Sequence, residues 1–353
     1  MGSTIKKFHT KLDQENLDGL ILSSSPNISY LTGYSSRDAY LVVSKKKNVY
    51  LTDARYIEEI KCNLHKNFLI KKINGSVFKI IADICKDLGL KRLGFEERHL
   101  PFAEYKKIRE ELNKAADLIP THSLVEELRQ LKSREELDKI KKAAQITIKA
   151  LEFIQRFISP GKKEIEVAAE LERFIRYHGA RTCAFDIIVA SGPNSSFPHH
   201  LTSQRKMKKN EPVLIDLGVD YFGYKSDLTR VFFLGKITPI FRRIYDIVLR
   251  AQEQAIEKIK PSVFINKIDA AARQYITQKG FGGFFYHNLG HGLGLEVHEL
   301  PHISGKENNT LKAGMVFTVE PAIYLPDKFG VRIEDMVLVT PEGCEIISDH
   351  LHK

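Results

Sequence analysis

The sequence of 353 residues contains no run of about 20 apolar residues, the length that a helix needs to cross a bilayer, so we expect no membrane span. Its first 20 residues lack the apolar core of a secretory signal and are typical of a helix, which favours a cytoplasmic protein. The cysteines are few and widely spaced, without a CxxC pair: Cys62, Cys85, Cys183 and Cys344. This spacing argues against a zinc knuckle or a disulfide framework and fits reduced thiols in the cytosol.

Motifs for nucleic-acid binding are also missing, although the net charge is +10. Basic runs such as Lys45–Lys47 are typical of solvated surfaces, because lysine is cheap to expose and costly to bury. Neither aromatic residues interleaved with the basic ones nor a helix-turn-helix or RNP-like motif occurs, so we expect no nucleic-acid partner. With 43% hydrophobic residues, a chain of this length can bury a full core and form two domains.

The first part of the chain alternates strand-like and helix-like stretches, which predicts an α/β domain over residues 1–124. Apolar runs predict strands at residues 19–23, 39–44, 49–52 and 68–73, and apolar periodicity predicts helices at residues 76–88 and 102–112. Residues 125–132 are expected to form a linker. Ser133 and Glu136 then match a capping box at the start of a long amphipathic helix, which Ser159–Gly161 ends, and a second domain covers residues 133–353.

The second domain contains a sequence pattern that occurs twice. A helix, Pro160, a helix and Gly179 are followed 101 residues later by a helix, Pro261, a helix and Gly280. Each half then carries two acidic residues in a strand–turn–strand context. Duplication of this unit would place the two acidic hairpins about a pseudo-twofold axis, facing one another across a shared site.

Four acids and one histidine of the second domain lie in or beside apolar, β-prone stretches, where an acid is expensive to bury without compensation. Two divalent cations would cancel the four negative charges, and oxygen ligands with a single imidazole suit Mn²⁺, Co²⁺, Fe²⁺ or Zn²⁺. Such a metal pair activates a water and polarises a carbonyl, which is the chemistry of amide hydrolysis. The five residues are Asp216 in VLIDLG, Asp227 in KSDLTR, His291 in GHGLG, Glu320 in FTVEP and Glu334 in VRIED.

The segments IDLGVDYFGYKSDLTRVF, HNLGHGLGLEVHELP, LKAGMVFTVEPAIY and GVRIEDMVLVT resemble the superfamily of methionine aminopeptidase, aminopeptidase P, prolidase and creatinase. The resemblance implies a pita-bread catalytic domain with a dinuclear metal centre. It implies that Asp216 serves one metal, that Asp227 and Glu334 bridge both, and that His291 and Glu320 serve the other. PNISYLTGY and YLTDARY resemble the non-catalytic N-terminal domain of creatinase and prolidase.

The same resemblance assigns roles to further histidines. It implies that His199, in a Pro-His pair, contacts the substrate and the oxyanion, and that His298 hydrogen-bonds the scissile carbonyl. His287 matches a histidine that borders the substrate pocket. His302 and His178 have no such match and are interpreted as structural or exposed.

Three other residues complete the expected site. Glu320 is the candidate to accept the proton of the attacking water and return it to the leaving nitrogen. Arg332 is expected near the acidic cluster, where it can bond carboxylates or a substrate carboxyl group, and Tyr324 is a candidate hydrogen-bonding residue of the cleft.

These observations predict a dinuclear-metal Xaa-Pro aminopeptidase, with prolidase as the alternative. The proline specificity rests on the resemblance of the N-terminal domain and of His199 to aminopeptidase P and prolidase. A non-hydrolytic pita-bread binding protein and a creatinase-type amidinohydrolase are disfavoured by the complete ligand set. Two ions per chain, Mn²⁺ or Co²⁺ before Zn²⁺ or Fe²⁺, a peptide substrate with proline at its second position, and a cytoplasmic homodimer are expected.

Overall fold

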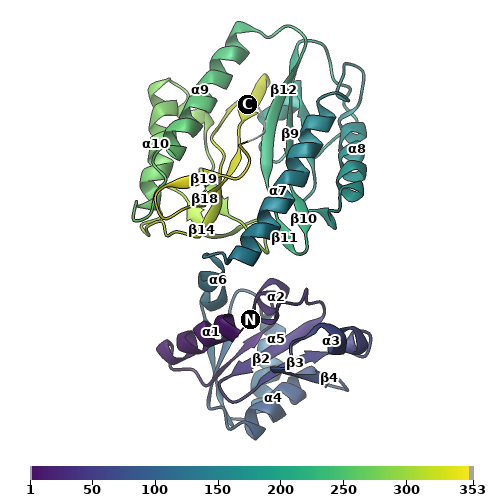
Figure 1. The fold of residues 1–353 in the computed structure, drawn as a ribbon, viewed down its shortest axis with the longest axis vertical. Coiled ribbons are helices and arrows are strands. Elements are labelled where there is room, and N and C mark those ends of the chain that lie inside the picture. Colours follow the sequence, from purple (N-terminus) through teal and green to yellow (C-terminus); the bar gives the residue numbers. More distant parts are fainter. Residues whose placement is uncertain (1, 350–353) are drawn as a thin grey trace. The chain divides into compact units, whose positions relative to one another are not determined.

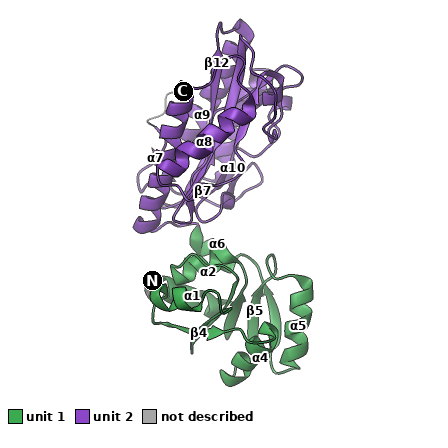
Figure 2. Ribbon diagram, turned by 90° about the vertical axis from the view of Figure 1, so that its right-hand side faces the viewer, with its two compact units in different colours: residues 1–129 green, residues 130–353 purple. Residues whose placement is uncertain are grey.

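The computed structural model describes residues 2–349 and divides into two compact units, residues 1–129 and residues 130–353 (Figure 2). Residues 125–132, expected as a linker, hold most of helix α6 (Leu124–Arg129) and the boundary between the units. Among the helices that the structure describes, none combines the length and the apolar character that crossing a bilayer requires.

Unit 1 is built on a six-stranded mixed sheet in the order β4-β3-β2-β1-β5-β6. The strand pairs β1–β5, β3–β4 and β5–β6 are parallel, and β1–β2 and β2–β3 are antiparallel. All four predicted strands are present, and β5 and β6 were not predicted. The strands are β1 (Gly19–Leu22), β2 (Ala39–Ser44), β3 (Asn48–Thr52), β4 (Phe68–Lys72), β5 (Arg92–Glu96) and β6 (Asp117–Thr121).

Helices connect and cover this sheet, with one apolar cluster around Leu20 and Leu41 and another around Ile21 and Val42. Successive strand residues point to opposite faces, so these alternating positions give the sheet two buried faces. The two predicted helices are found at α4 and α5. The helices are α1 (Gly2–Gln14), α2 (Ser25–Thr32), α3 (Ile57–Asn63), α4 (Val77–Asp87) and α5 (Phe102–Leu112), followed by α6.

Unit 2 begins with the predicted capping box: the Ser133 side chain accepts from the Glu136 amide, and the Glu136 side chain accepts from the Ser133 amide. The helix that follows ends at Ile154, earlier than the predicted stop at Ser159–Gly161. Helices α7 and α8 lie on one side of the central strands, and α9 and α10 on the other (Figure 1). The four helices are α7 (Arg134–Ile154), α8 (Glu164–Tyr177), α9 (Pro239–Ile256) and α10 (Ile265–Gln278).

The strands of unit 2 form a sheet in the order β12-β9-β8, a sheet in the order β14-β13-β15-β18-β19, and two smaller sheets, β11-β10-β7 and β16-β17. Two short 3₁₀ segments, residues 192–196 and 282–284, lie in the loops. The strands are β7 (Thr182–Cys183), β8 (Ile188–Ser191), β9 (Glu211–Leu217), β10 (Val219–Tyr221), β11 (Tyr224–Lys225), β12 (Leu228–Leu234), β13 (Gly290–Gly292), β14 (Glu299–Ile303), β15 (Val316–Val319), β16 (Ala322–Leu325), β17 (Phe329–Arg332), β18 (Asp335–Val339) and β19 (Cys344–Ile346).

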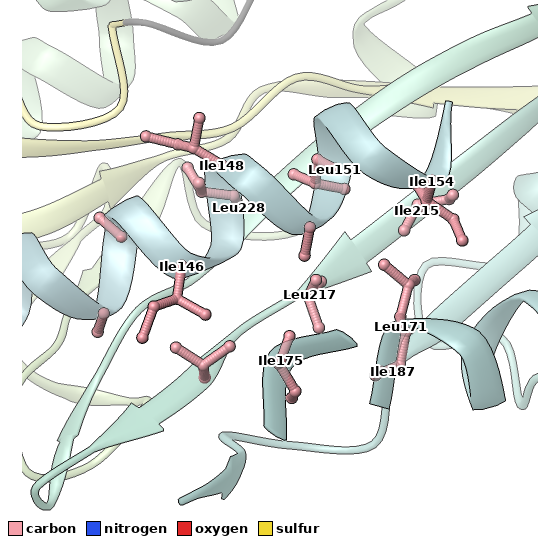
Figure 3. Packing of buried hydrophobic residues seen from close by; sticks show 14 of the residues in the cluster. Ile146, Ile148, Leu151, Ile154, Leu171, Ile175, Ile187, Ile215, Leu217 and Leu228 are labelled. Atoms are coloured by element: carbon pink, nitrogen blue, oxygen red, sulfur yellow. The ribbon is translucent and has the colours of Figure 1, made fainter. Parts of the chain in front are cut away.

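Two apolar cores hold the helices of unit 2 against its strands. In the first, Leu151 and Ile154 of α7 and Leu171 of α8 pack toward Ile215 of β9 (Figure 3). In the second, side chains of α9 and α10 pack with β15–β18. Asp216, Asp227 and Glu334 are buried among these strands, so little of each side chain is exposed to solvent.

Helices α8 and α10 begin with similar backbone hydrogen bonds, whose donors are 101 residues apart, the predicted offset, and whose acceptors are 104 residues apart. The Glu164 and Ile165 amides of α8 donate to the Arg205 and Ser203 carbonyls at 3.1 Å each. The amides of Ile265 and Asn266 in α10 donate in the same way to the carbonyls of residues 309 and 307, at 2.9 and 3.1 Å. This shared pattern agrees with the internal duplication that the sequence predicts.

Candidate metal centre

One cavity of about 690 Å³ in unit 2 brings together every residue that the sequence singled out as a ligand, a catalytic group or a substrate contact. They come from widely separated segments of the chain. Ten of the residues that line it are those predicted from the sequence: His199, Asp216, Asp227, His287, His291, His298, Glu320, Tyr324, Arg332 and Glu334.

Two strand hairpins position the four acids. Asp216 lies in β9, directly opposite Thr229 of β12, and Asp227 immediately precedes β12. Glu320 follows β15, and Glu334 lies in the two-residue break between β17 and β18. The Thr229 hydroxyl donates to Glu334 Oε2 at 2.7 Å and thereby joins the acid of one half to a strand of the other. These are the two acid-bearing hairpins that the sequence duplication predicted.

His291 is held in β13 by close backbone packing. A side chain at Gly290 would meet the Thr318 carbonyl oxygen at 1.9 Å, and one at Gly292 would meet the Leu300 carbonyl oxygen at 2.2 Å, so both positions require glycine. His291 Nδ1 lies 3.2 Å from the Gly292 carbonyl oxygen, which can only accept. Nδ1 therefore carries a hydrogen, and Nε2, directed at the acids, is the atom that a metal would bind. Without a metal, burial acts to lower the pKa of His291, but the contact with Glu320 outweighs it and raises that pKa.

The acids converge on this nitrogen. His291 Nε2 lies 3.3 Å from Glu320 Oε1 and 3.7 Å from Asp227 Oδ2. Ligand atoms of Asp227, His291 and Glu334 all lie within 4.8 Å of one another, close enough to share an ion.

Electrostatics in the cavity are unfavourable without added positive charge. Burial, together with the charge of Glu334, raises the pKa of Asp227 well above its usual value, and burial with the charge of Glu320 does the same to the pKa of Glu334. Burial also acts to raise the pKa of Glu320, but the contact with His291 outweighs it and lowers that pKa to about 2.

Asp216 shows the same shortage of positive charge in its contacts. Its Oδ2 forms an ion pair with Arg332, whereas its Oδ1 is buried without a hydrogen-bond partner. An orphaned carboxylate oxygen is costly in a protein interior unless an ion completes it. Four carboxylates and one imidazole are hard and borderline donors, so the residues present fit divalent ions.

Three histidines surround this cluster on the cavity wall. The His298 ring is tilted by 54° against that of His291, with 4.0 Å between the centroids, and burial, with the neighbouring His291, lowers the pKa of His298 to about 4. His287 Nε2 lies 3.2 Å from the Tyr324 hydroxyl, and burial lowers the pKa of His287. His199 lies on the exposed loop after β8.

Arg332 links the acids to the His199 loop. Its guanidinium donates to the Tyr324 hydroxyl at 2.7 Å and to the Pro198 carbonyl oxygen at 3.1 Å, in addition to its ion pair with Asp216. Its Nε donates to the Thr229 hydroxyl at 3.1 Å. These bonds hold the guanidinium between the acid cluster and the His199 loop.

Three residues in or beside the cavity were not assigned to the site from the sequence. His302, interpreted as structural or exposed, lines the cavity from β14, opposite His291 of β13. His200 also lines it, and its Nε2 lies 2.9 Å from the buried carboxylate of Glu164. An acid in the first turn of a helix is usual for electrostatic reasons, so nothing in the sequence distinguished Glu164.

Comparison with known proteins assigns both units. Residues 138–341 match the model of metallopeptidase family M24, and residues 4–131 match the creatinase/prolidase N-terminal domain. The two matches together account for nearly the whole chain. Their boundary falls close to the division between the two compact units.

Individual relatives agree in length and fold. An Xaa-Pro dipeptidase of Pyrococcus horikoshii is 35% identical over 350 residues, covering 98% of this chain and 96% of its own. The structure of an Xaa-Pro dipeptidase from Bacillus anthracis is 38% identical, with a TM-score of 0.96 and coverage of 99% and 98%. The structure of an X-Pro aminopeptidase from Thermotoga maritima is 33% identical, with a TM-score of 0.89 and coverage of 96% and 97%.

Proposed function

The chain belongs to metallopeptidase family M24, and on that basis we propose that it hydrolyses the peptide bond between an amino-terminal residue and a following proline. The observation that carries the proposal is the convergence of Asp227, His291 and Glu334 ligand atoms within 4.8 Å inside the cavity. Relatives named as Xaa-Pro peptidases, similar over almost the full length of the chain, support the substrate class.

We infer that two divalent ions occupy the centre, with Asp216 serving one, Asp227 and Glu334 bridging both, and His291 and Glu320 serving the other. When bound, the ions supply Lewis acidity that lowers the pKa of a water and polarises the scissile carbonyl. The cluster of uncompensated buried acids supports two positive ions over one, because four carboxylates are balanced within the cavity mainly by Arg332.

The protein's own residues then position the substrate and move the proton. Glu320 accepts the proton of the attacking water and returns it to the prolyl nitrogen, which has no N–H of its own. His298, a neutral imidazole beside His291, donates to the carbonyl oxygen as negative charge develops there. His199 contacts the substrate from the loop after β8, and His287 with Tyr324 borders the pocket.

Between the two Xaa-Pro activities, we favour the dipeptidase over the aminopeptidase. This reverses the order expected from the sequence, because the solved structures with higher TM-scores to this chain are named Xaa-Pro dipeptidase and prolidase. The chain is also similar to the X-Pro aminopeptidase structure, so aminopeptidase activity is the alternative.

We also infer a cytoplasmic homodimer that works with Mn²⁺ or Co²⁺, or with Zn²⁺ or Fe²⁺ in their place. The four cysteines are free, which suits a reducing compartment. Oxygen-rich ligands with one imidazole suit these ions. Sedimentation at micromolar concentration should give a dimer, and a monomer would contradict the assembly.

Hydrolysis of Ala-Pro and of Ala-Pro-Ala tests the function, with protein stripped by a chelator and reloaded with Mn²⁺ or Co²⁺. Metal-dependent cleavage of the dipeptide alone identifies a dipeptidase, and cleavage of the tripeptide identifies an aminopeptidase. If the protein binds two ions per chain but cleaves neither peptide, the proline specificity is wrong. If it binds no metal, the assignment of all five ligands is wrong.

A further inference from the structure

A buried carboxylate outside the metal cluster receives an unusual number of hydrogen bonds. Glu164 opens helix α8, and its side chain is 0% exposed. All its side-chain partners lie in residues 191–203, the segment that carries His199. They are the amide and hydroxyl of Ser191 (2.7 Å each), Asn194 Nδ2 (3.0 Å), His200 Nε2 (2.9 Å), and the amide and hydroxyl of Ser203 (3.2 and 2.5 Å).

The internal duplication shows that the fold does not need an acid at this place. The amide of Ile265 in α10 makes the backbone bond that the Glu164 amide makes in α8, 101 residues earlier. Ile265 is fully buried in an ordinary apolar core. Burying a carboxylate instead costs free energy that its hydrogen bonds must offset. The two halves differ in the loop that faces each helix. The loop that faces α8 carries His199, and the loop that faces α10 has no such residue.

Two contacts hold the backbone on either side of His199. The carbonyl oxygen of Pro198, immediately before it, accepts from Arg332 at 3.1 Å. The ring of His200, immediately after it, is bonded to Glu164 at 2.9 Å. His199 therefore lies between a contact from the metal side of the cavity and a contact from α8. Its own side chain is left exposed to the cleft.

The loop is restrained further along as well. The Ser195 hydroxyl accepts from the Gly330 amide at 2.9 Å, two residues before Arg332. Thr202 bonds to the amide of Val189 at 2.9 Å and to the carbonyl oxygen of Ile187 at 2.7 Å. These bonds fix both ends of the segment but do not touch the Pro198–His200 stretch. Glu164 and Asn194 Nδ2, itself bonded to Glu164, reach His200 Nε2 directly, at 2.9 and 3.3 Å.

We propose that Glu164 and His200 form a positioning pair that holds His199 in place against the substrate. Neither Glu164 nor His200 acts on the reacting atoms. The inference rests on the proposed function in one respect, because it takes His199 as a substrate contact. A catalytic group must be held within a fraction of an ångström, and a displacement of about 1 Å can lower the rate about 100-fold. Glu164 reaches the reaction only through His200 and the loop.

The first test needs no substrate. In Glu164→Gln, the amide group replaces an acceptor oxygen by a donor that faces other donors, and in His200→Ala the ring contact is lost. We expect amide hydrogen exchange in residues 192–203 to become at least about tenfold faster in both variants. The matched control is Glu170→Gln on the same helix, a partly exposed acid paired with Arg173 and distant in sequence from residues 192–203, which should leave exchange unchanged. Unchanged exchange in both test variants would overturn the positioning pair.

The second test is a double-mutant cycle with His199→Ala, using the metal-loaded enzyme and an Xaa-Pro dipeptide. If Glu164 acts through His199, Glu164→Gln should lower kcat/KM about 10- to 100-fold in the wild-type background and less than about 3-fold in the His199→Ala background. Metal content should be equal in all four proteins, because no ligand is changed. Equal losses in the two backgrounds would mean a general structural role and would overturn the proposal.

The results of the two tests distinguish an error in the positioning role of Glu164 from an error in the proposed function. If the wild-type protein cleaves no Xaa-Pro peptide, the proline specificity is wrong, yet the exchange measurement still decides whether Glu164 and His200 hold the loop. If the peptide is cleaved and the cycle is additive, the function stands and the positioning role falls.

Discussion

Arg332 forms a buried ion pair with Asp216 and leaves the second oxygen of that carboxylate without a partner. The same guanidinium donates to Tyr324 and to the Pro198 carbonyl oxygen. One cation thus offsets part of the charge of the acid cluster and also joins that cluster to the loop of His199. The charges of Arg332 and Asp216 therefore depend on each other, and removing either one should change the free energy of unfolding of the metal-free protein.

Replacing Arg332 by methionine should destabilise the metal-free protein by about 3–5 kcal/mol, because it leaves Asp216 buried without its cation. The loss should be smaller in metal-loaded protein, where an ion compensates the same carboxylate. Urea denaturation with chelator and with Mn²⁺ measures both. Arg173→Met, at an exposed arginine paired with Glu170, is the control and should cost less than about 1 kcal/mol. An equal loss with and without metal would contradict the link.

Asp227→Asn should have opposite effects on function and on stability. It should abolish activity and metal binding together, since Asp227 is proposed to bridge both ions. It should also stabilise the metal-free protein by about 1 kcal/mol, because burial and the charge of Glu334 make the Asp227 carboxylate unfavourable. Metal analysis and thermal denaturation of stripped protein test this. Asp220→Asn, at an acid paired with Lys225, is the control and should keep both ions. Retention of a tenth of the activity in Asp227→Asn would refute the bridging role.

The fold was predictable where a segment's own residues specify its structure. Strand β2 and helix α5 lie at the predicted positions because an apolar run and apolar periodicity mark them. Strands β5 and β6 were missed because they contain residues that are unfavourable in strands, among them Gly94, Asp117 and Pro120. Their parallel pairing with each other, and that of β5 with β1, depends on contacts between distant segments.

The candidate site divides in the same way. Its ligands could be found because an acid such as Asp216, flanked by Ile215 and Leu217, is conspicuous inside a strand. Glu164 could not, because its importance lies in six contacts to a loop 27 or more residues later in the chain. The proximity of His302 to the cavity likewise depends on the pairing of β14 with β13.

Lys132 and Glu299 form a second buried ion pair, with Lys132 Nζ 2.5 Å from Glu299 Oε1 and side chains 1% and 3% exposed. Glu299 is the first residue of β14 and follows His298 directly, so the pair fixes the start of the strand next to this cleft histidine. Lys132→Met should lower the free energy of unfolding by about 3–5 kcal/mol, because it removes the buried cation that offsets the charge of the Glu299 carboxylate. Lys132→Met with Glu299→Leu should lower it less. Denaturation midpoints measure both variants.

A surface pair provides the comparison for this prediction. Lys141 and Glu345 lie 2.6 Å apart with side chains 37% and 44% exposed, and Lys141→Met should cost less than about 1 kcal/mol. If the double variant at Lys132 and Glu299 is no more stable than Lys132→Met alone, the loss in the single variant does not come from an unpaired charge.

The stabilising effect of Glu164 should depend on pH in a defined direction. Burial acts to raise the pKa of this carboxyl, but the bonds from Ser203, Ser191 and His200 outweigh it and lower the pKa below its ordinary value near 4.5. The folded protein therefore binds fewer protons here than the unfolded chain. The contribution is complete above about pH 5 and is lost as pH falls through the lowered pKa. Glu164→Gln, which does not titrate, lacks this contribution at every pH.

The difference in unfolding free energy between wild type and Glu164→Gln should accordingly be about 3 kcal/mol at pH 7, stay constant down to about pH 5, and shrink below it. Urea denaturation at several pH values between 3.5 and 7 measures the curve, with Glu170→Gln as a control expected to differ little from wild type throughout. A difference that grows on acidification would mean that the loop donors favour the protonated carboxyl. Glu164 would then hold His200 as a neutral acid, and the loop would be held most firmly at low pH.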